Sequence, residues 1–221
     1  MIFPALAVSL GAFSSGSPFA GVGAQRELIK LMSYEFPLAI AGISAAWLIS
    51  INKPGLDVFS LSVISNNPVW SFVGYPGFLG LILIFTSLLF VVPGELGRVP
   101  FDVQEADTEI AGGVFAEYSG RSLAMFYIAD AVKIVAITSL VIALFLPWNL
   151  SPLFGLSGLF ALVADTLFFL FKMFLILLVC SVIRTVTARL KITKIVTFYW
   201  FYATSIAFLG LLLIWIDTIL G

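Results

Sequence analysis

The chain has 221 residues, of which 61% are hydrophobic and only 10% are charged. Soluble domains are nearer to about a quarter charged, so the composition excludes that class and predicts an all-α, polytopic transmembrane helical bundle. The net charge of −1 provides no basic surface for nucleic acid. Histidine is absent and Cys180 is the single cysteine, so we expect no metal site, no cofactor site and no catalytic residue in this chain.

The first residues, 1–13, are apolar but few. As a helix they would extend about 20 Å, less than the roughly 30 Å of a hydrocarbon core, so we predict a partial helix. A signal peptide is the alternative, but no Lys or Arg precedes Arg26 to form its charged region. The chain is expected to form one transmembrane domain over 1–221, with five full spans at roughly 33–51, 76–92, 122–146, 161–183 and 195–219.

Basic residues alternate between the loops that join these spans. The segments 14–32, 94–121 and 184–194 together carry eight Lys or Arg residues, whereas the loops on the opposite side carry only Lys53. The positive-inside rule places the basic loops on the cytoplasmic side of the cell membrane. We therefore expect the loop 94–121 to face the cytoplasm.

This loop, 94–121, is also where acidic residues gather. Together with the preceding Pro93 it holds six of the chain's twelve acidic residues, and charge beside a bilayer rarely accumulates without a function. A short helix is predicted from about Val103 to Ala111. Asp102 and Glu105 have the spacing of a capping box, which would explain these two acids structurally.

Helix capping does not explain the remaining acids. Glu109 lies four residues after Glu105 and would repel it on one helix face. Crowded carboxylates titrate as a group, so such a cluster can take up protons or hold cations near neutral pH. Arg98 and Arg121 are possible counter-charges, and static salt bridges or a solvated acidic loop are the alternatives. The acids that we assign to charge relay here are Glu95, Asp102, Glu105, Asp107, Glu109 and Glu117.

Ionisable residues also fall within the predicted spans, where they are functional candidates by default. Asp130 and Lys133 are three residues apart on one helix face and are placed to pair. Glu117 lies about 20 Å from Asp130 along a helix axis, a spacing that suits successive steps of an inward path. Lys172 falls in mid-span and needs a carboxylate or a water-filled cavity nearby. Glu35 is a further candidate, whereas Asp165 and Asp217 lie close to span ends and can reach water.

Several motifs along the chain together resemble one family. The acidic loop reads Glu95, Arg98, Pro100-Phe101-Asp102, Glu105, Asp107, Glu109 and Glu117-Tyr118, and it is preceded by Gly23-Ala24-Gln25-Arg26 and Ser33-Tyr34-Glu35 and followed by Lys172 and Arg184-Thr185. This pattern is similar to that of the membrane subunit that joins the peripheral and membrane arms of respiratory complex I and of the related energy-converting membrane-bound hydrogenases.

The resemblance implies roles for particular residues. In that family the acidic loop and the region from Arg26 to Glu35 line a chamber below the last iron–sulfur cluster of a soluble partner. Glu35, Glu117, Asp130 and Lys172 would begin a charge path into the membrane, and Asp130 stands where many relatives have Glu. The residues implied at the chamber or its interface are Arg26, Arg98, Arg121 and Arg184.

The resemblance also implies partners. These are soluble subunits with a nickel–iron site and iron–sulfur clusters, and antiporter-like membrane subunits. The segment from Ser14 to Glu27 is more similar to the hydrogenase-like branch, in which electrons pass from ferredoxin to protons. The alternative is the quinone-chamber subunit of a complex I-type oxidoreductase. Members of the family begin with further helices before the position of Met1, so we expect these to be missing from the sequence or supplied by another subunit.

The predicted function is therefore a subunit of a redox-driven complex that moves H⁺ or Na⁺ and has no activity alone. A free-standing cation transporter using Asp130, Lys133 and Lys172 is a second hypothesis, against which the absence of an internal repeat counts. A purely structural anchor, whose acidic loop docks a soluble subunit, is a third.

Overall fold

The computed structural model describes residues 2–155 and 157–220, except for the side chains of residues 107, 108 and 153. Within these residues the chain is helical and has no strand, which confirms the all-α prediction. Five segments are long and apolar enough to cross a membrane. They are α2 (Pro18–Asn52), α4 (Tyr75–Glu95), α6 (Gly120–Phe145), α8 (Gly158–Val186) and Ile192–Leu220, which is made of α9 (Ile192–Thr197), the π-helical turn η3 (Phe198–Ala203) and α10 (Thr204–Leu220).

The remaining elements are short. The apolar helix α1 (Ile2–Ser14) is too short to span, which confirms the predicted partial helix. The connections between spans hold α3 (Leu61–Asn66), η1 (Val69–Phe72), α5 (Asp107–Ile110), η2 (Gly113–Phe115) and α7 (Ser151–Phe154).

The first span begins at Pro18, about fifteen residues earlier than the sequence predicts. Proline suits the first turn of a helix because its missing N–H would have no partner there. Hydropathy favours a later start because Glu27 and Lys30 are charged. In the structure these two side chains are buried and paired with each other, so the helix continues through them.

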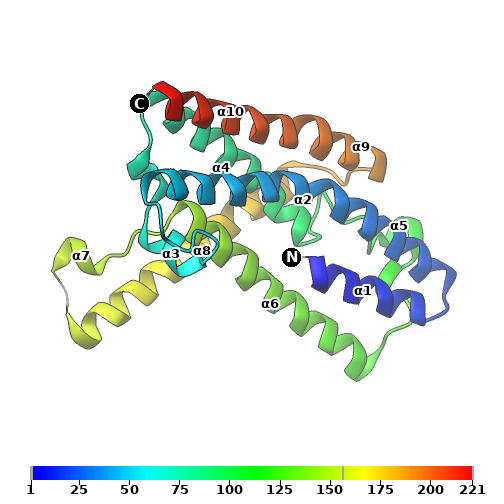
Figure 1. Cartoon of the computed structure of the whole chain (residues 1–221). Helices are drawn as coiled ribbons and strands as arrows, with labels where there is room; N and C mark the ends of the chain where they lie inside the picture. Colours follow the sequence, from blue (N-terminus) through cyan, green and yellow to red (C-terminus); the bar gives the residue numbers. More distant parts are fainter. Residues whose placement is uncertain (1, 156, 221) are drawn as a thin grey trace.

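Helices α2, α4 and α10 lie side by side and form one layer of the molecule (Figure 1). Two glycines set the approach of α4 to α10. A Cβ atom on Gly80 would lie 2.5 Å from the carbonyl oxygen of Gly210, and one on Gly210 would lie 2.6 Å from that of Gly80. Small residues at such crossings let helix backbones come into direct contact, which is how helices commonly associate in membranes.

Helix α6 crosses beside this layer, and α8 extends away from it together with α7 (Figure 1). The buried residues of α8 are Lys172, Ile176 and Cys180, and much of its remaining apolar surface is exposed. Cys180 belongs to the hydrophobic core. Helix α1 lies against α2, at the end of the molecule that carries α5 (Figure 1).

The acidic loop contains less helix than predicted. Within the predicted stretch only Asp107–Ile110 is helical, and the residue before it, Ala106, gives no side-chain cap. The capping-box prediction for Asp102 and Glu105 is therefore wrong. The loop is fixed by longer-range contacts instead: the backbone N–H of Val114 donates to the carbonyl of Gln104 at 3.2 Å. The helix ends close to Ala111, as predicted, and the following Gly112 and Gly113 both have positive φ, 89° and 51°.

Candidate charge-relay site

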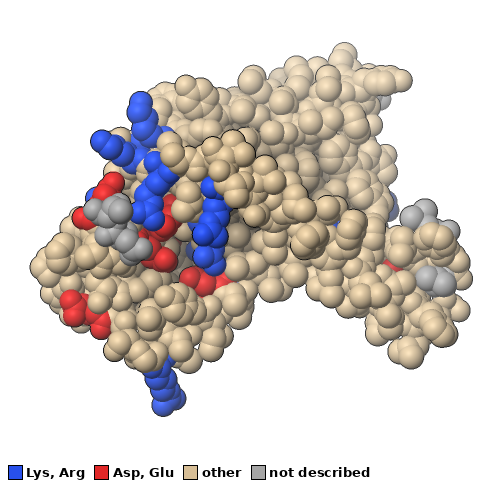
Figure 2. Space-filling model, turned by 180° about the vertical axis from the view of Figure 1, so that it is seen from behind, with Lys and Arg blue, Asp and Glu red and all other residues tan. Residues whose placement is uncertain are grey.

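Charged side chains gather at one end of the molecule, around the acidic loop (Figure 2). This is the end at which α4 and α8 finish and at which α2 and α6 begin. Figure 2 shows acidic and basic side chains together around a hollow in this face. The candidate site lies at this end, partly on the surface and partly inside it.

The first inner pair comes from α2. Glu27 and Lys30 are 2% and 0% exposed, and the ammonium of Lys30 lies 2.6 Å from a carboxylate oxygen of Glu27. Lys30 also donates a 2.8 Å hydrogen bond to the side-chain oxygen of Gln104 in the loop. The spacing of three residues puts both charges on one helix face, and the pairing satisfies two groups that could not otherwise be buried.

Gly23 lets the loop reach this pair. A Cβ atom at this position would lie 2.8 Å from the amide nitrogen of Val114 and 2.9 Å from the carbonyl oxygen of Gln104. A larger residue would push the loop away from α2. Packing therefore explains the glycine of the Gly-Ala-Gln-Arg motif: its small size lets the loop approach α2 closely enough for Gln104 to contact Lys30.

The second inner pair joins α4 to α6. Glu95, the last residue of α4, is fully buried, and a carboxylate oxygen lies 3.5 Å from the ammonium of Lys133. Glu95 also interacts electrostatically with Tyr34, Glu35 and Lys30 of α2. The ring of Tyr34 packs edge-on against Tyr199, with ring centres 6.1 Å apart. Glu95 therefore links the charges of α2 to those of α6.

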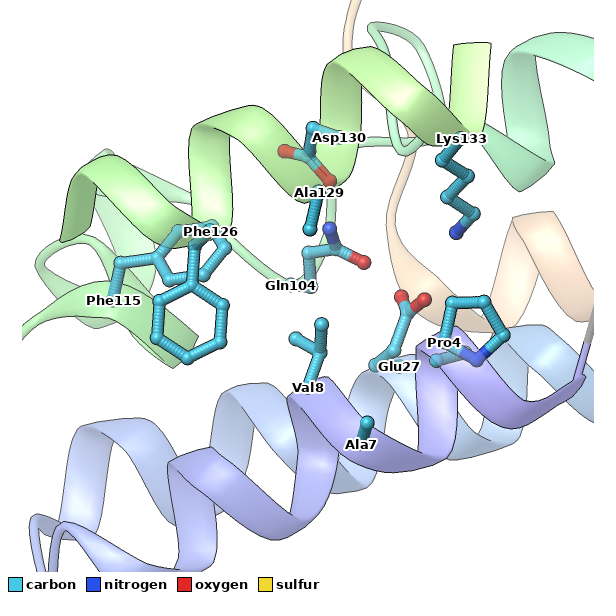
Figure 3. A pocket seen from close by; sticks show the side chains of 11 residues that line it. Pro4, Ala7, Val8, Glu27, Gln104, Phe115, Phe126, Ala129, Asp130 and Lys133 are labelled. Carbon is cyan, nitrogen blue, oxygen red and sulfur yellow. The ribbon is translucent and has the colours of Figure 1, made fainter. Parts of the chain in front are cut away.

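A cavity of about 180 Å³ lies between α1, α2 and α6. Figure 3 shows Glu27, Gln104, Asp130 and Lys133 directed into it. Its other wall is apolar and is formed by Pro4, Ala5, Ala7, Val8, Phe115, Phe126 and Ala129. Because a water molecule occupies roughly 30 Å³ of liquid and needs polar partners, this cavity suits a short chain of water molecules.

Lys133 forms its ion pair with Glu95 and not with Asp130, the partner that the sequence spacing predicts. Asp130 and Lys133 nevertheless line the same cavity (Figure 3) and interact electrostatically. The ammonium of Lys133 thus faces two carboxylates, one from α4 and one from its own helix.

Glu105 lies on the loop above this cluster and is partly buried. Burial and, to a smaller extent, repulsion by the neighbouring Asp102 raise the pKa of Glu105 above its usual value. The amide of Gln104 donates a long hydrogen bond of 3.4 Å to its carboxylate. Glu105 is therefore the loop acid outside the spans whose protonation the fold favours.

The outer acids form static salt bridges, one of the alternatives for this loop. Arg26 pairs with Glu109 at 2.6 Å, and Arg189 pairs with Asp102 at 2.7 Å. Both pairs tie the loop to another part of the chain. They lie near the surface, where such pairs contribute about 0–1 kcal/mol.

The remaining predicted residues lie outside this cluster or at its edge. Glu35 is partly buried on α2 and interacts with Glu95. Glu117, Arg98, Arg121 and Arg184 are exposed, and the side chain of Asp107 lies outside the described residues. Among the residues that the structure describes, no group of three Asp, Glu or Cys side chains is arranged to hold a metal ion.

Lys172 donates its hydrogen bonds to the protein backbone. Its ammonium donates to the backbone carbonyls of Leu146 and Trp148, each at 2.8 Å, and lies 4.9 Å from the centre of the Phe168 ring. Asp165 also interacts electrostatically with Lys172, so a carboxylate lies nearby as expected, although the ammonium bonds directly to the two backbone carbonyls. Leu146 follows Asp130 by sixteen residues, which is about 24 Å along a helix. Lys172 therefore binds the backbone just after the C-terminal end of α6 and lies far from the charged residues near the acidic loop.

Asp165 and Asp217 have structural roles at span ends. Asp165 accepts hydrogen bonds from the backbone N–H groups of Leu150 and Ser151 at 2.9 and 2.8 Å. Asp217 accepts one at 2.7 Å from the N–H of Gly74, directly before α4. Both acids satisfy backbone donors that a helix start leaves without partners.

Four residues of the inner pairs and their contacts are not individually predicted as site residues, although Tyr34 belongs to the motif Ser33-Tyr34-Glu35: Glu27, Lys30, Tyr34 and Gln104. The spacing of Glu27 and Lys30, three residues apart within a helix that could extend to Pro18, is the signal that could have identified the first pair. The burial of Tyr34 and Gln104 depends on tertiary packing, and their sequence neighbours give no sign of it.

Comparison with known proteins agrees with this architecture. The family described as NADH dehydrogenase matches residues 1–215. One subunit of the F(420)H(2) dehydrogenase of Methanosarcina mazei is 27% identical over 194 residues, which is 87% of this chain and 53% of that protein. One subunit of the NADH-quinone oxidoreductase of Phocaeicola vulgatus is 27% identical over 210 residues, which is 93% of this chain and 57% of that protein.

A solved structure is similar over most of the chain. It belongs to the membrane-bound sulfane sulfur reductase, an archaeal respiratory membrane complex, and it matches with a TM-score of 0.75 and 30% identity over 94% of this chain and 64% of that one. The chain spans about half the length of the two curated relatives. These matches confirm the resemblance found in the motifs: the chain is a membrane protein that belongs to the NADH dehydrogenase family.

Proposed function

We propose that this chain is the ion-translocating membrane subunit of a redox-driven complex. It would couple electron transfer in a peripheral arm to the movement of H⁺ or Na⁺. The observation that supports this best is the buried cluster of Glu27, Lys30, Glu95 and Lys133, which continues to Asp130 along the polar wall of the cavity. Ionisable groups inside a membrane protein are rare and usually mark ion pathways.

The geometry supports a relay in which charges exchange partners. Lys133 lies 3.5 Å from Glu95, farther than the 2.7–2.9 Å of a tight charged hydrogen bond. Protonation of Glu95 would weaken this pair and release the ammonium toward Asp130, across the cavity. Lys30 stands in a similar position between Glu27 and Gln104. Coupled carboxylates of this kind change protonation together.

The acidic loop would transmit the redox event to this cluster. It covers the cluster, because Gln104 contacts Lys30 and Glu105 carries a raised pKa beside it. We place the loop on the cytoplasmic side, below soluble subunits that carry a nickel–iron site and iron–sulfur clusters, with antiporter-like membrane subunits beside the spans. The preferred reaction is electron transfer from ferredoxin to protons.

A quinone-reducing complex is the second candidate, supported by the names of the relatives and by the apolar wall of the cavity. The cavity of about 180 Å³ is smaller than the roughly 300–1,000 Å³ of typical ligand pockets. A quinone would need additional walls from other subunits. Turnover that depends on an added short-chain quinone would favour this candidate over the hydrogenase-like one.

The double substitution Glu105→Gln with Glu109→Gln tests the proposal in the assembled complex. We expect the soluble subunits to remain bound, while ion transport per electron falls after reconstitution into liposomes. Normal transport per electron would contradict the proposal. Loss of the soluble subunits would favour the structural anchor instead, and ion flux by the purified chain alone would favour the free-standing transporter.

A further inference from the structure

A second groove lies at the same end of the molecule, with a volume of about 290 Å³. Its lining shares no residue with the cavity of the relay site. It is formed by Leu96, Arg98, Ile134, Leu177, Cys180, Ser181 and Arg184. These residues come from α6, from α8 and from the turn that follows α4.

The two arginines of this groove form no salt bridge with a described carboxylate, although Arg98 interacts at longer range with Asp130. Arg26 and Arg189 each pair with an acid, whereas Arg98 and Arg184 have none within 4 Å among the described side chains. Both are exposed. Two guanidinium groups without a salt bridge beside one groove attract an anion, and their planar N–H groups match the oxygens of a phosphate.

The depth of the groove fits a lipid. Arg98 lies just after the end of α4 at Glu95, and Arg184 lies in the last turn of α8, so both stand at the level where spans meet the interface. Leu177 lies seven residues before Arg184, about 10 Å deeper along α8. The groove therefore has a cationic rim and an apolar floor, as a phosphate headgroup with its acyl chain requires.

We propose that this groove binds an anionic membrane lipid, with its phosphate between Arg98 and Arg184 and an acyl chain along Ile134 and Leu177. Basic pockets between transmembrane helices are recognised sites for anionic headgroups. The apolar surface that α8 leaves exposed continues this site into the hydrocarbon. Lipid binding in this groove does not depend on which ion the relay site moves or on the direction in which it moves.

The test uses the purified complex after its lipid has been removed with detergent. Dioctanoyl phosphatidylglycerol is titrated in, and the bound lipid is counted by native mass spectrometry and followed by the rise in Tm. Dioctanoyl phosphatidylcholine is the neutral comparison. We expect the phosphatidylglycerol to bind at least about tenfold more tightly than the phosphatidylcholine. The double substitution Arg98→Gln with Arg184→Gln should remove this preference.

The matched control is Lys191→Gln with Lys194→Gln, which removes two exposed positive charges at the same end but outside the groove. This control should bind the lipid as the unaltered complex does. If the double arginine variant is not recovered, Arg184→Gln alone and Arg98→Lys with Arg184→Lys are measured in its place, and only the glutamine variant should lose binding.

Three outcomes would overturn the proposal. The first is an arginine variant that keeps its preference for the anionic lipid, or a lysine control that loses it equally. The second is a rise in Tm with inorganic phosphate as large as that with the lipid, which would indicate an anion site without a role for the acyl chain. The third is loss of another subunit from the arginine variant with unchanged lipid binding, which would show that a protein occupies the groove.

Discussion

At the scale of single residues, Glu105 shows how the loop couples its fold to protonation. Its carboxyl group is partly buried beside Asp102, and these surroundings raise its pKa. The folded chain therefore holds this proton more tightly than the unfolded chain does. The stability that follows is fully present below the unfolded pKa, near 4.5, and is lost as the pH rises through the folded pKa.

Glu105→Gln should therefore raise the Tm of the complex at pH 7.5 and change it little near pH 4.5, because glutamine resembles the protonated acid. Measurement of Tm across this pH range checks the sign. Glu117→Gln, at an exposed position of the same loop, is the control and should have little effect at either pH. A lower Tm for the Glu105 variant at pH 7.5 would be inconsistent with a raised pKa.

The pair of Glu95 and Lys133 makes a second residue-scale prediction. Removing one member of a buried pair leaves the other charge without compensation, which costs about 3–5 kcal/mol. Lys133→Met should therefore destabilise the chain strongly, because Glu95 is fully buried. Adding Glu95→Gln should recover much of the loss.

Denaturant unfolding of both single variants and of the double variant measures this coupling. Lys194→Met, at an exposed site, is the control and should change stability by less than about 0.5 kcal/mol. Additive effects of the two single substitutions would indicate that Glu95 and Lys133 do not interact.

At the scale of elements, the contact of α4 with α10 depends on the glycines that face each other there. Gly210→Ala would place a methyl group 2.6 Å from the carbonyl oxygen of Gly80 and equally close to Ile84. Overpacking of this kind typically costs about 1–3 kcal/mol. Gly42→Ala is the matched control, since a Cβ atom there meets nothing within 4 Å.

We expect Gly210→Ala to lower Tm, and Gly42→Ala to leave it unchanged or raise it slightly, because alanine favours helix more than glycine does. Differential scanning fluorimetry of the two variants makes the comparison. Equal Tm values would show that α4 and α10 do not rely on this close approach.

The sequence predicts the positions of the helices better than it predicts the contacts that their side chains make. Apolar runs identify the five spans because hydropathy is a local property. Hydropathy misses the start of α2 at Pro18 because the charges of Glu27 and Lys30 are compensated within the fold. The helix predicted from Val103 contracts to α5 because Asp102 pairs with Arg189, far along the chain, and does not cap.

The same reason limits what the sequence reveals about the site. Acids such as Glu95 and Asp130 stand out because charge is rare in this chain, and both lie in the inner cluster or its cavity. Which lysine faces which acid depends on how helices pack. That is why the sequence spacing identifies Asp130 as a neighbour of Lys133 but misses Glu95, which forms the ion pair, and why it does not predict the backbone partners of Lys172.

At the scale of the whole molecule, the charges lie mainly at one end (Figure 2), and we place this end in the cytoplasm. Cysteine labelling tests this orientation in a Cys180→Ala background. Glu117→Cys lies in the acidic loop, and Ser62→Cys lies on α3 at the opposite end, both at exposed positions. A membrane-impermeant maleimide should label position 62 in intact cells and position 117 in inside-out vesicles. The reverse labelling pattern would show that the acidic loop lies on the opposite side of the membrane.

The coupling role of the buried cluster is tested most directly by ion transport per electron in liposomes that contain the complex with Glu95→Gln. Asp57→Asn serves as the control, because it removes an exposed acid that lies outside the cluster and has no assigned relay role. Because Lys133 still faces Asp130 in the Glu95 variant, we predict that this variant assembles and transfers electrons but moves far fewer ions per electron than the control. Equal ion transport per electron in the two variants would contradict the proposed role.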